Sequence, residues 1–179
     1  MCCVASSQKL KIVTRYKLSK KDKKALFEEA MREVGAEVAG LINSSENVEV
    51  AKLKHASLTE LYFVDGMVTL ARFEKAGLIP SLYLIYRKGI TPSYPSVYVD
   101  QGAIPHILNG ADVMVPGIKM IEGEFDAGSK ILVRDHDKGR VIAIGVSLMS
   151  SQELRAVHKG KAIKNLHYLN DDIWQLSLS

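Results

Sequence analysis

The sequence is short of cysteine and of long apolar runs, and both shortages limit the class of protein. Its 179 residues include only two cysteines, Cys2 and Cys3, which are adjacent. Adjacent cysteines cannot join distant segments, so we expect no disulfide framework and a reducing, cytoplasmic setting. No apolar run approaches the roughly 20 residues that span a bilayer. The first residues also lack the pattern of a secretory signal, so we expect no membrane partner.

Catalytic and metal-binding motifs are also lacking. The sequence contains no G-x-S-x-G elbow, no P-loop and no G-x-G-x-x-G turn. None of its five histidines shows metal-ligand spacing. The best candidate, His136 between Asp135 and Asp137, falls in an expected hairpin turn, where exposed polar residues are normal. We therefore predict no metal, no cofactor and no enzyme activity.

The bulk composition is that of a folded protein with an uneven charge. Hydrophobic residues make up 47% and charged residues 25%, which is ordinary for a globular chain of one large or two small domains. The net charge is +4, but residues 1–92 hold 15 basic against 10 acidic residues, while residues 93–179 hold 9 against 10. The positive charge is therefore concentrated in the first half, which favours an anionic partner there.

A dense basic run lies at residues 9–24, with eight basic residues and one acidic residue. Ser19 and Asp22 fit a helix capping box, with Asp22 in place of the usual Glu or Gln. The run has two interpretations, a solvated face or a surface that attracts phosphate. Lysines in the first helical turn oppose the helix dipole, and phosphate contact would offset that cost. The phosphate interpretation assigns this role to Lys20, Lys21, Lys23 and Lys24.

The apolar patterns of the first half predict a mixed α and β arrangement. Residues 9–17 alternate as a strand, a helix follows from Ser19 to Gly35, and residues 36–42 form a second short helix before a polar loop at 43–47. Asp65-Gly66 is typical of a tight hairpin turn. Further strands are expected at residues 48–53, 58–64, 67–73 and 78–86. Residues 91–96, rich in proline and serine, mark the expected domain boundary.

The second half predicts short strands and two small helices, which is typical of a small barrel. One helix runs from Asp100 to Asn109 and ends at Gly110. The other begins in a capping box at residues 150–153 and runs to about His158. Strands are expected at residues 97–99, 113–115, 130–134, 140–148, 162–169 and 173–178, the last two as a hairpin.

Several motifs of this second half, in order, resemble a PUA domain. The resemblance covers nearly all of residues 97–178. It is carried by Val99–Ile104 (VDQGAI), Leu108–Ile118 (LNGADVMVPGI), Ile131–Val133, the aliphatic-Ala-aliphatic-Gly strand Val141–Ser147, and Gly160-Lys161-Ala162. Because many motifs fall in the family's order, the resemblance is far more specific than any one of them.

Other segments resemble a narrower family, the translation machinery-associated and malignant T-cell-amplified sequence proteins with their archaeal relatives. These segments are Asn165–Trp174, Val64–Gly66, Phe73–Gly77 and Pro80–Leu84. The resemblance implies an α+β fold. An N-terminal α/β pre-PUA module at residues 1–92 would precede a C-terminal PUA pseudo-β-barrel at residues 97–179.

The family resemblance implies RNA binding, either to tRNA or to rRNA, on the small ribosomal subunit during initiation or recycling. A translation-factor protein is a further candidate partner. Bare backbone at Gly110, Pro116 and Gly117 would let RNA approach, and the N–H groups around Gly110 and Ala111 would donate to phosphate or 2′-hydroxyl oxygens. Lys161 would contact a phosphate. Local chemistry alone favours Gly110 as a helix end and Pro116-Gly117 as a turn, and it is the family resemblance that favours RNA contact. The predicted RNA-binding residues are Gly102, Ala103, Leu108, Gly110, Ala111, Val115, Pro116, Gly117 and Lys161.

Three other functions fit the same layout. They are a ribosome-biogenesis adaptor, an accessory protein of RNA modification, and a protein-docking module. Trp174 also has two interpretations, because it can stack on an RNA base or pack over the end of the barrel. Tyr83 and Tyr86 are placed by the strand prediction on an exposed sheet face.

Overall fold

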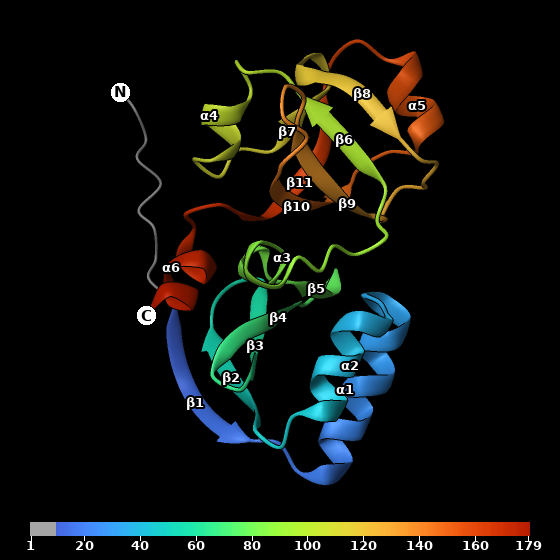
Figure 1. Cartoon of the computed structure of the whole chain (residues 1–179). Coiled ribbons are helices and arrows are strands. Elements are labelled where there is room, and N and C mark those ends of the chain that lie inside the picture. The colour runs from blue at the N-terminus through green and yellow to red at the C-terminus, as the bar shows by residue number, and fades with distance from the viewer. Residues whose placement is uncertain (1–9) are drawn as a thin grey trace.

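The computed structural model describes residues 10–179, which form two sheets flanked by helices (Figure 1). The expectations for Cys2, Cys3 and Lys9 fall outside these residues. The α+β fold class is confirmed. None of the helices in the part of the chain that the model describes is long and apolar enough to cross a membrane.

The first sheet is an antiparallel meander with strand order β1-β2-β3-β4-β5. Its strands are β1 (Lys11–Lys17), β2 (Val48–Lys54), β3 (Leu58–Val64), β4 (Met67–Phe73) and β5 (Gly77–Pro80). Two helices, α1 (Lys20–Glu33) and α2 (Ala36–Ser44), lie against one side of this sheet (Figure 1). Their apolar side chains share a buried cluster with side chains of β2, β3, β4 and β5.

The turns of this half follow the local chemistry of the sequence. The Ser19 hydroxyl accepts a hydrogen bond from the Asp22 amide and begins α1, as the capping box predicted. The helix ends before Gly35, which adopts a φ of 136°. Asp65 and Gly66 have positive φ angles of 50° and 82°, so the predicted β3–β4 hairpin turn is confirmed. The polar loop begins later than expected, because α2 continues through Ser44.

The strand predicted at residues 78–86 is wrong beyond Pro80. The chain turns there into helix α3 (Leu82–Lys88). The buried Ser81 hydroxyl accepts a hydrogen bond from the Leu84 amide and begins the helix, and Gly89 ends it in a left-handed conformation. Tyr83 and Tyr86 therefore lie on a helix and not on a sheet face.

The second sheet has strand order β7-β11-β10-β9-β6-β8 and curls around its own core. β6 and β9 are parallel, and the other pairs are antiparallel. Its strands are β6 (Ser96–Val99), β7 (Val113–Met114), β8 (Ile118–Glu122), β9 (Lys130–Asp135), β10 (Val141–Ser147) and β11 (Lys161–Tyr168). Short helical segments α4 (Ile104–Ile107), η1 (Val115–Gly117) and α5 (Ser151–Ala156) connect them.

Four features of this half differ from the expectations. β8 was not predicted, and the strand expected at 113–115 ends at Met114, where η1 begins. The helix expected from Asp100 is shorter, because the Asp100 carboxylate closes a turn onto the Ala103 amide before α4 starts. The final strand is instead helix α6 (Asp172–Leu178), which the Asp171 carboxylate caps by accepting from the Trp174 amide.

The two halves share one apolar cluster and several buried polar contacts. The cluster joins residues of the first sheet and α3 to Leu132, Val141, Ile144 and Ile173. Trp174 of α6 meets the rings of Tyr83 and Tyr86 edge-on, each at 5.8 Å between ring centroids. Of the two interpretations of Trp174, packing within the protein is therefore the one that the structure shows. Its partner is α3, however, and not the end of the barrel.

His167 is a fully buried polar side chain at this junction. Its Nε2 accepts a hydrogen bond from the Leu82 amide at 2.9 Å, and its Nδ1 lies 2.7 Å from Asp171 Oδ2. Because Nε2 is an acceptor, the neutral ring carries its proton on Nδ1 and donates it to Asp171. His167 thus links the start of α3 to the cap of α6.

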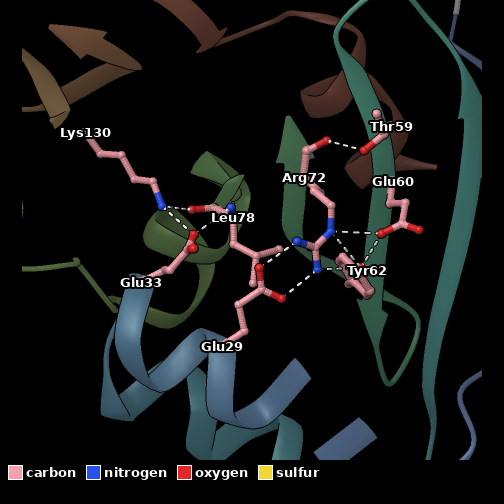
Figure 2. Close-up of polar contacts among 8 residues, drawn as sticks. All are labelled: Glu29, Glu33, Thr59, Glu60, Tyr62, Arg72, Leu78 and Lys130. Carbon is pink, nitrogen blue, oxygen red and sulfur yellow. Dashed lines mark hydrogen bonds and ion pairs between the residues drawn. The ribbon is translucent and has the colours of Figure 1, made fainter. Parts of the chain in front are cut away.

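An ion pair on another side of the junction connects α1 to β9 (Figure 2). Lys130 Nζ lies 2.8 Å from the Glu33 carboxylate and donates to the Leu78 carbonyl, while the Leu78 amide donates to Glu33. Burial alone would raise the pKa of Glu33, but these hydrogen bonds and the Lys130 and Arg72 charges outweigh it and hold that pKa below its usual value. The contact therefore stabilises the fold above the usual carboxyl pKa and weakens as pH falls.

Figure 2 also shows how Arg72 of β4 ties α1 to the first sheet. Its guanidinium donates two hydrogen bonds to the Glu29 carboxylate, at 2.6 and 2.7 Å, and a third to Glu60 at 2.9 Å. The paired geometry suits a planar guanidinium and fixes the helix on the sheet. Together with the Glu33–Lys130 pair, it gives α1 a fixed position relative to both sheets.

Candidate functional site

An open groove of about 670 Å³ lies between α4, β7, η1 and the start of β11, and we call it the α4 groove. α4 and β7 are at the end of the molecule opposite the start of α1 (Figure 1). The groove is lined by Asp100, Ala103, His106, Ile107, Gly110, Ala111, Asp112, Met114, Pro116, Gly117 and Lys161.

The groove brings together six of the nine residues that the sequence singled out. Three others do not line it. Gly102 is exposed in the turn before α4, Leu108 packs against the core of the second sheet, and Val115 is itself part of that core. The six that line the groove are Ala103, Gly110, Ala111, Pro116, Gly117 and Lys161.

The backbone amides at Gly110 and Ala111 are not available to RNA, contrary to expectation. Gly110 N–H donates to the Ile107 carbonyl at 3.0 Å, and Ala111 N–H donates to the His106 carbonyl at 3.0 Å. With Gly110 at a φ of 93°, this is the Schellman arrangement that closes a helix. The interpretation of Gly110 as a helix end is therefore confirmed, and its direct role is to shape the groove wall.

At Gly117, η1 packs closely on the turn before α4, and there is little room for a side chain. A Cβ built at Gly117 would lie 3.0 Å from the Ala103 Cβ. The Gly117 carbonyl also accepts a hydrogen bond from the Asp100 amide at 2.9 Å. Any larger residue would push η1 away and change the width of the groove.

Lys161 is the groove's exposed cation, and it is held loosely. Its Nζ lies 3.5 Å from Asp112 Oδ2, and its side chain is 64% exposed. Exposed ion pairs of this kind contribute little, about 0–1 kcal/mol, so a phosphate can replace Asp112 as the partner. Asp112 is itself fixed, because its Oδ1 accepts from the Asn165 amide at 2.9 Å.

Among the lining residues that the sequence analysis did not single out, Met114 and His106 are the exposed ones. Met114 lies in the segment predicted as the strand 113–115, and 46% of it is exposed. A flexible apolar side chain and an imidazole ring are both surfaces on which a base can lie. The alternation of Val113, Met114 and Val115 was the signal that Met114 faces away from the core.

The lysine run at the start of α1 lies far from this groove (Figure 1). Lys23 has a structural role, since its Nζ donates to the carbonyls of Asn43 and Ser45 at the end of α2. Lys20, Lys21 and Lys24 are exposed, and within residues 10–179 their side chains form no hydrogen bond or ion pair. Lys20, Lys21 and Lys24 therefore form a basic surface separate from the α4 groove. Lys23 does not contribute to it, because its ammonium group is engaged by carbonyls at the end of α2.

Among the residues that the structure describes, no group of three or more histidine, cysteine or acidic side chains is arranged to hold a metal ion. His136 and Asp137 are exposed in the β9–β10 turn, with 3.9 Å between His136 Nδ1 and Asp137 Oδ1. Asp135 instead accepts from the Lys138 amide and pairs with Arg140. Its pKa is lowered chiefly by the backbone hydrogen bond, so this carboxylate stabilises the turn.

Comparison with known proteins defines the class first. Residues 95–169 match the PUA domain model, and residues 14–88 match a domain of unknown function, DUF1947. The chain is thus a PUA-domain protein with a DUF1947 region before it. It belongs to the family of translation machinery-associated and malignant T-cell-amplified sequence proteins, so the resemblance noted in the sequence is confirmed.

Three similar proteins illustrate the family. An uncharacterized protein of Methanocaldococcus jannaschii is 38% identical, over 92% of this chain and 98% of its own length. Translation machinery-associated protein 20 of Saccharomyces cerevisiae is 32% identical, over 77% of each chain. The crystal structure of a hypothetical protein from Pyrococcus horikoshii superimposes with a TM-score of 0.73 and 32% identity, over 92% of this chain and 99% of that one.

Proposed function

We propose that this protein binds RNA through the α4 groove and acts, without catalysis, with the translation machinery in the cytoplasm. The observation that carries the proposal is the groove itself, which combines an exposed lysine with an apolar surface inside a PUA domain. The similarity to translation machinery-associated protein 20 supports the cellular setting. The RNA would be tRNA or rRNA on the small ribosomal subunit, during initiation or recycling.

The groove favours recognition of an unpaired strand. Met114 and Pro116 offer an apolar surface to a base, and His106 of α4 also lines the groove. Lys161 would exchange its loose contact with Asp112 for a phosphate oxygen. Because Gly110 and Ala111 use their amides internally, affinity would come from this cation and from base contacts.

We predict that Lys161→Gln weakens RNA binding and makes it less sensitive to salt. Loss of one phosphate contact should reduce the slope of log K against log salt by about 0.7 for a single strand. Fluorescence anisotropy with a labelled 12-nucleotide single-stranded RNA, titrated between 50 and 200 mM salt, measures both quantities (roughly the range over which such slopes are resolved). Lys75→Gln, an exposed lysine after β4, is the matched control. Equal slopes for Lys161→Gln and wild type would contradict the proposal.

A separate prediction concerns the lysine run. We propose that Lys20, Lys21 and Lys24 add weak attraction to phosphate, so replacing all three with Gln should flatten the salt dependence of RNA binding further. Lys23→Gln should instead lower stability, because it removes donors from the end of α2. If the triple variant keeps the wild-type slope, the run is only a solvated face.

The ribosomal assignment is tested by co-sedimentation from cell extract. The proposal expects this protein with mature small subunits, and expects Lys161→Glu to release it. Co-sedimentation with precursors of the large subunit would instead support a biogenesis adaptor. Absence from all RNA-containing fractions at low salt would support a protein-docking module.

A further inference from the structure

A second groove lies across η1 from the first, and we call it the α5 groove. It has a volume of about 390 Å³ and runs between β8 and the last turn of α5. Figure 1 shows α5 beside the end of β8, on the far side of the barrel from α4. The side chains that matter for its chemistry are Lys119, Met120, Arg155, Val157 and His158.

The α5 groove combines cations with exposed apolar side chains. Met120 is 44% and Val157 38% exposed, although both are apolar. Lys119 and His158 are exposed on opposite walls, and within residues 10–179 no ion pair involves either. Arg155 is engaged by Glu124 at 2.8 Å, so it contributes less free charge. Apolar platforms bordered by cations are typical of surfaces that hold a single strand of nucleic acid.

Two further observations concern the connection between the grooves and the free edge of β8. Pro116 of η1 lines both of them, so the two grooves meet at this residue. β8 stands at the end of the strand order, and within the described chain its outer edge pairs with no other strand. Among the described residues, the backbone groups on that edge are free of strand pairing, and residues 118–121 of the same strand line the α5 groove.

We propose that the α5 groove is a second RNA subsite, which takes the strand as it leaves the α4 groove past Pro116. Lys119 and His158 hold its phosphates, and Met120 and Val157 support its bases. This inference rests on the proposed function, because the strand enters from the α4 groove. A peptide adding to the β8 edge is the competing occupant, and the unpaired charge of Lys119, with the Arg155 guanidinium on the α5 side, favours RNA.

The test compares RNA of two lengths. A 4-nucleotide strand is short enough to fill the α4 groove alone, whereas a 12-nucleotide strand is long enough to reach both grooves (roughly the site sizes of comparable single-strand binders). We expect the double variant Lys119→Glu/His158→Glu to bind the longer RNA roughly tenfold more weakly at 50 mM salt, and the shorter RNA almost as well as wild type. Lys75→Glu/His136→Glu, at exposed sites outside both grooves, replaces one lysine and one histidine in the same way and so makes the same change in net charge.

The outcomes separate the two proposals. If the double variant binds both lengths like the control variant, while Lys161→Glu still weakens both, the second subsite is refuted and the α4 groove stands. If wild type binds neither length at 50 mM salt, the proposed function itself fails. If the double variant weakens both lengths equally, the effect is one of general charge and the subsite is refuted. Circular dichroism of the variants confirms that each is folded.

Discussion

Gly145→Ala is expected to destabilise the protein by about 3 kcal/mol or more, the largest effect we predict for adding a single methyl group. A Cβ at this position of β10 would lie 2.4 Å from the Lys164 carbonyl oxygen and 2.5 Å from Ile163 Cγ2 on β11. A carbonyl in the middle of a sheet cannot move aside as the end of a flexible side chain can. Urea denaturation followed by circular dichroism measures the free energy of unfolding.

Gly40→Ala is the matched control for this prediction. Gly40 lies inside α2, and a Cβ there would have no atom within 4 Å. Alanine favours a helix interior over glycine by roughly 0.5–1 kcal/mol, so this variant should be slightly more stable than wild type. The same added methyl group is thus expected to have opposite effects at the two sites. A Gly145→Ala protein as stable as wild type would show that β10 and β11 do not approach as closely as described.

His167→Ala is expected to lower the free energy of unfolding by about 3 kcal/mol. The substitution leaves a cavity and removes the acceptor of the Leu82 amide and the donor to Asp171. All three groups lie where α3, β11 and α6 meet, so we expect the contact between the two sheets to loosen as well. Thermal or urea unfolding gives the first quantity, and hydrogen exchange of α3 and α6 amides gives the second.

Two further variants separate the hydrogen bonds from the loss of volume. His167→Gln keeps an oxygen that can accept from the Leu82 amide, so it should lose less stability than His167→Ala. His136→Ala removes an exposed imidazole in the β9–β10 turn and should stay within about 0.5 kcal/mol of wild type. If His167→Ala and His136→Ala were equally mild, the buried imidazole would not be a structural link.

The sequence correctly predicted the helix starts and the hairpin turn that depend only on neighbouring residues. Ser19 and Ser150 cap their helices, and Asp65-Gly66 turns its hairpin, because each uses hydrogen bonds or φ angles within a few residues. These features need no knowledge of distant contacts. The family resemblance then supplied the order of the two halves.

The mistaken elements depend on contacts from elsewhere in the chain. Residues 82–88 and 172–178 are apolar and aromatic enough to suggest strands, but they form α3 and α6, which pack against each other through Trp174 and the two tyrosines. Ser81 and Asp171 carried the capping signals that were available to correct both predictions. β8 was missed because its exposed residues, such as Lys119 and Met120, weaken the strand pattern.

The candidate site was predicted in outline but not in its chemistry. The resemblance assigned Gly110, Pro116, Gly117 and Lys161 to RNA contact, and the structure places all four around one groove, while the RNA contact stays a prediction. It did not reveal that the Gly110 amide is already bonded within the chain, because a Schellman closure depends on where the preceding helix ends. The structural use of Lys23 was also hidden, since its acceptors lie about 20 residues further along the chain.

The most direct test of the account is to map the RNA contact surface by NMR. Backbone amide shifts would be followed while the isotope-labelled protein is titrated with a 12-nucleotide single-stranded RNA at low salt, a length of roughly one single-strand site. The account predicts saturable shifts around the α4 groove, at residues 110–117 and at Lys161. Shifts confined to the first sheet and its helices, or no saturable shifts at all, would contradict it.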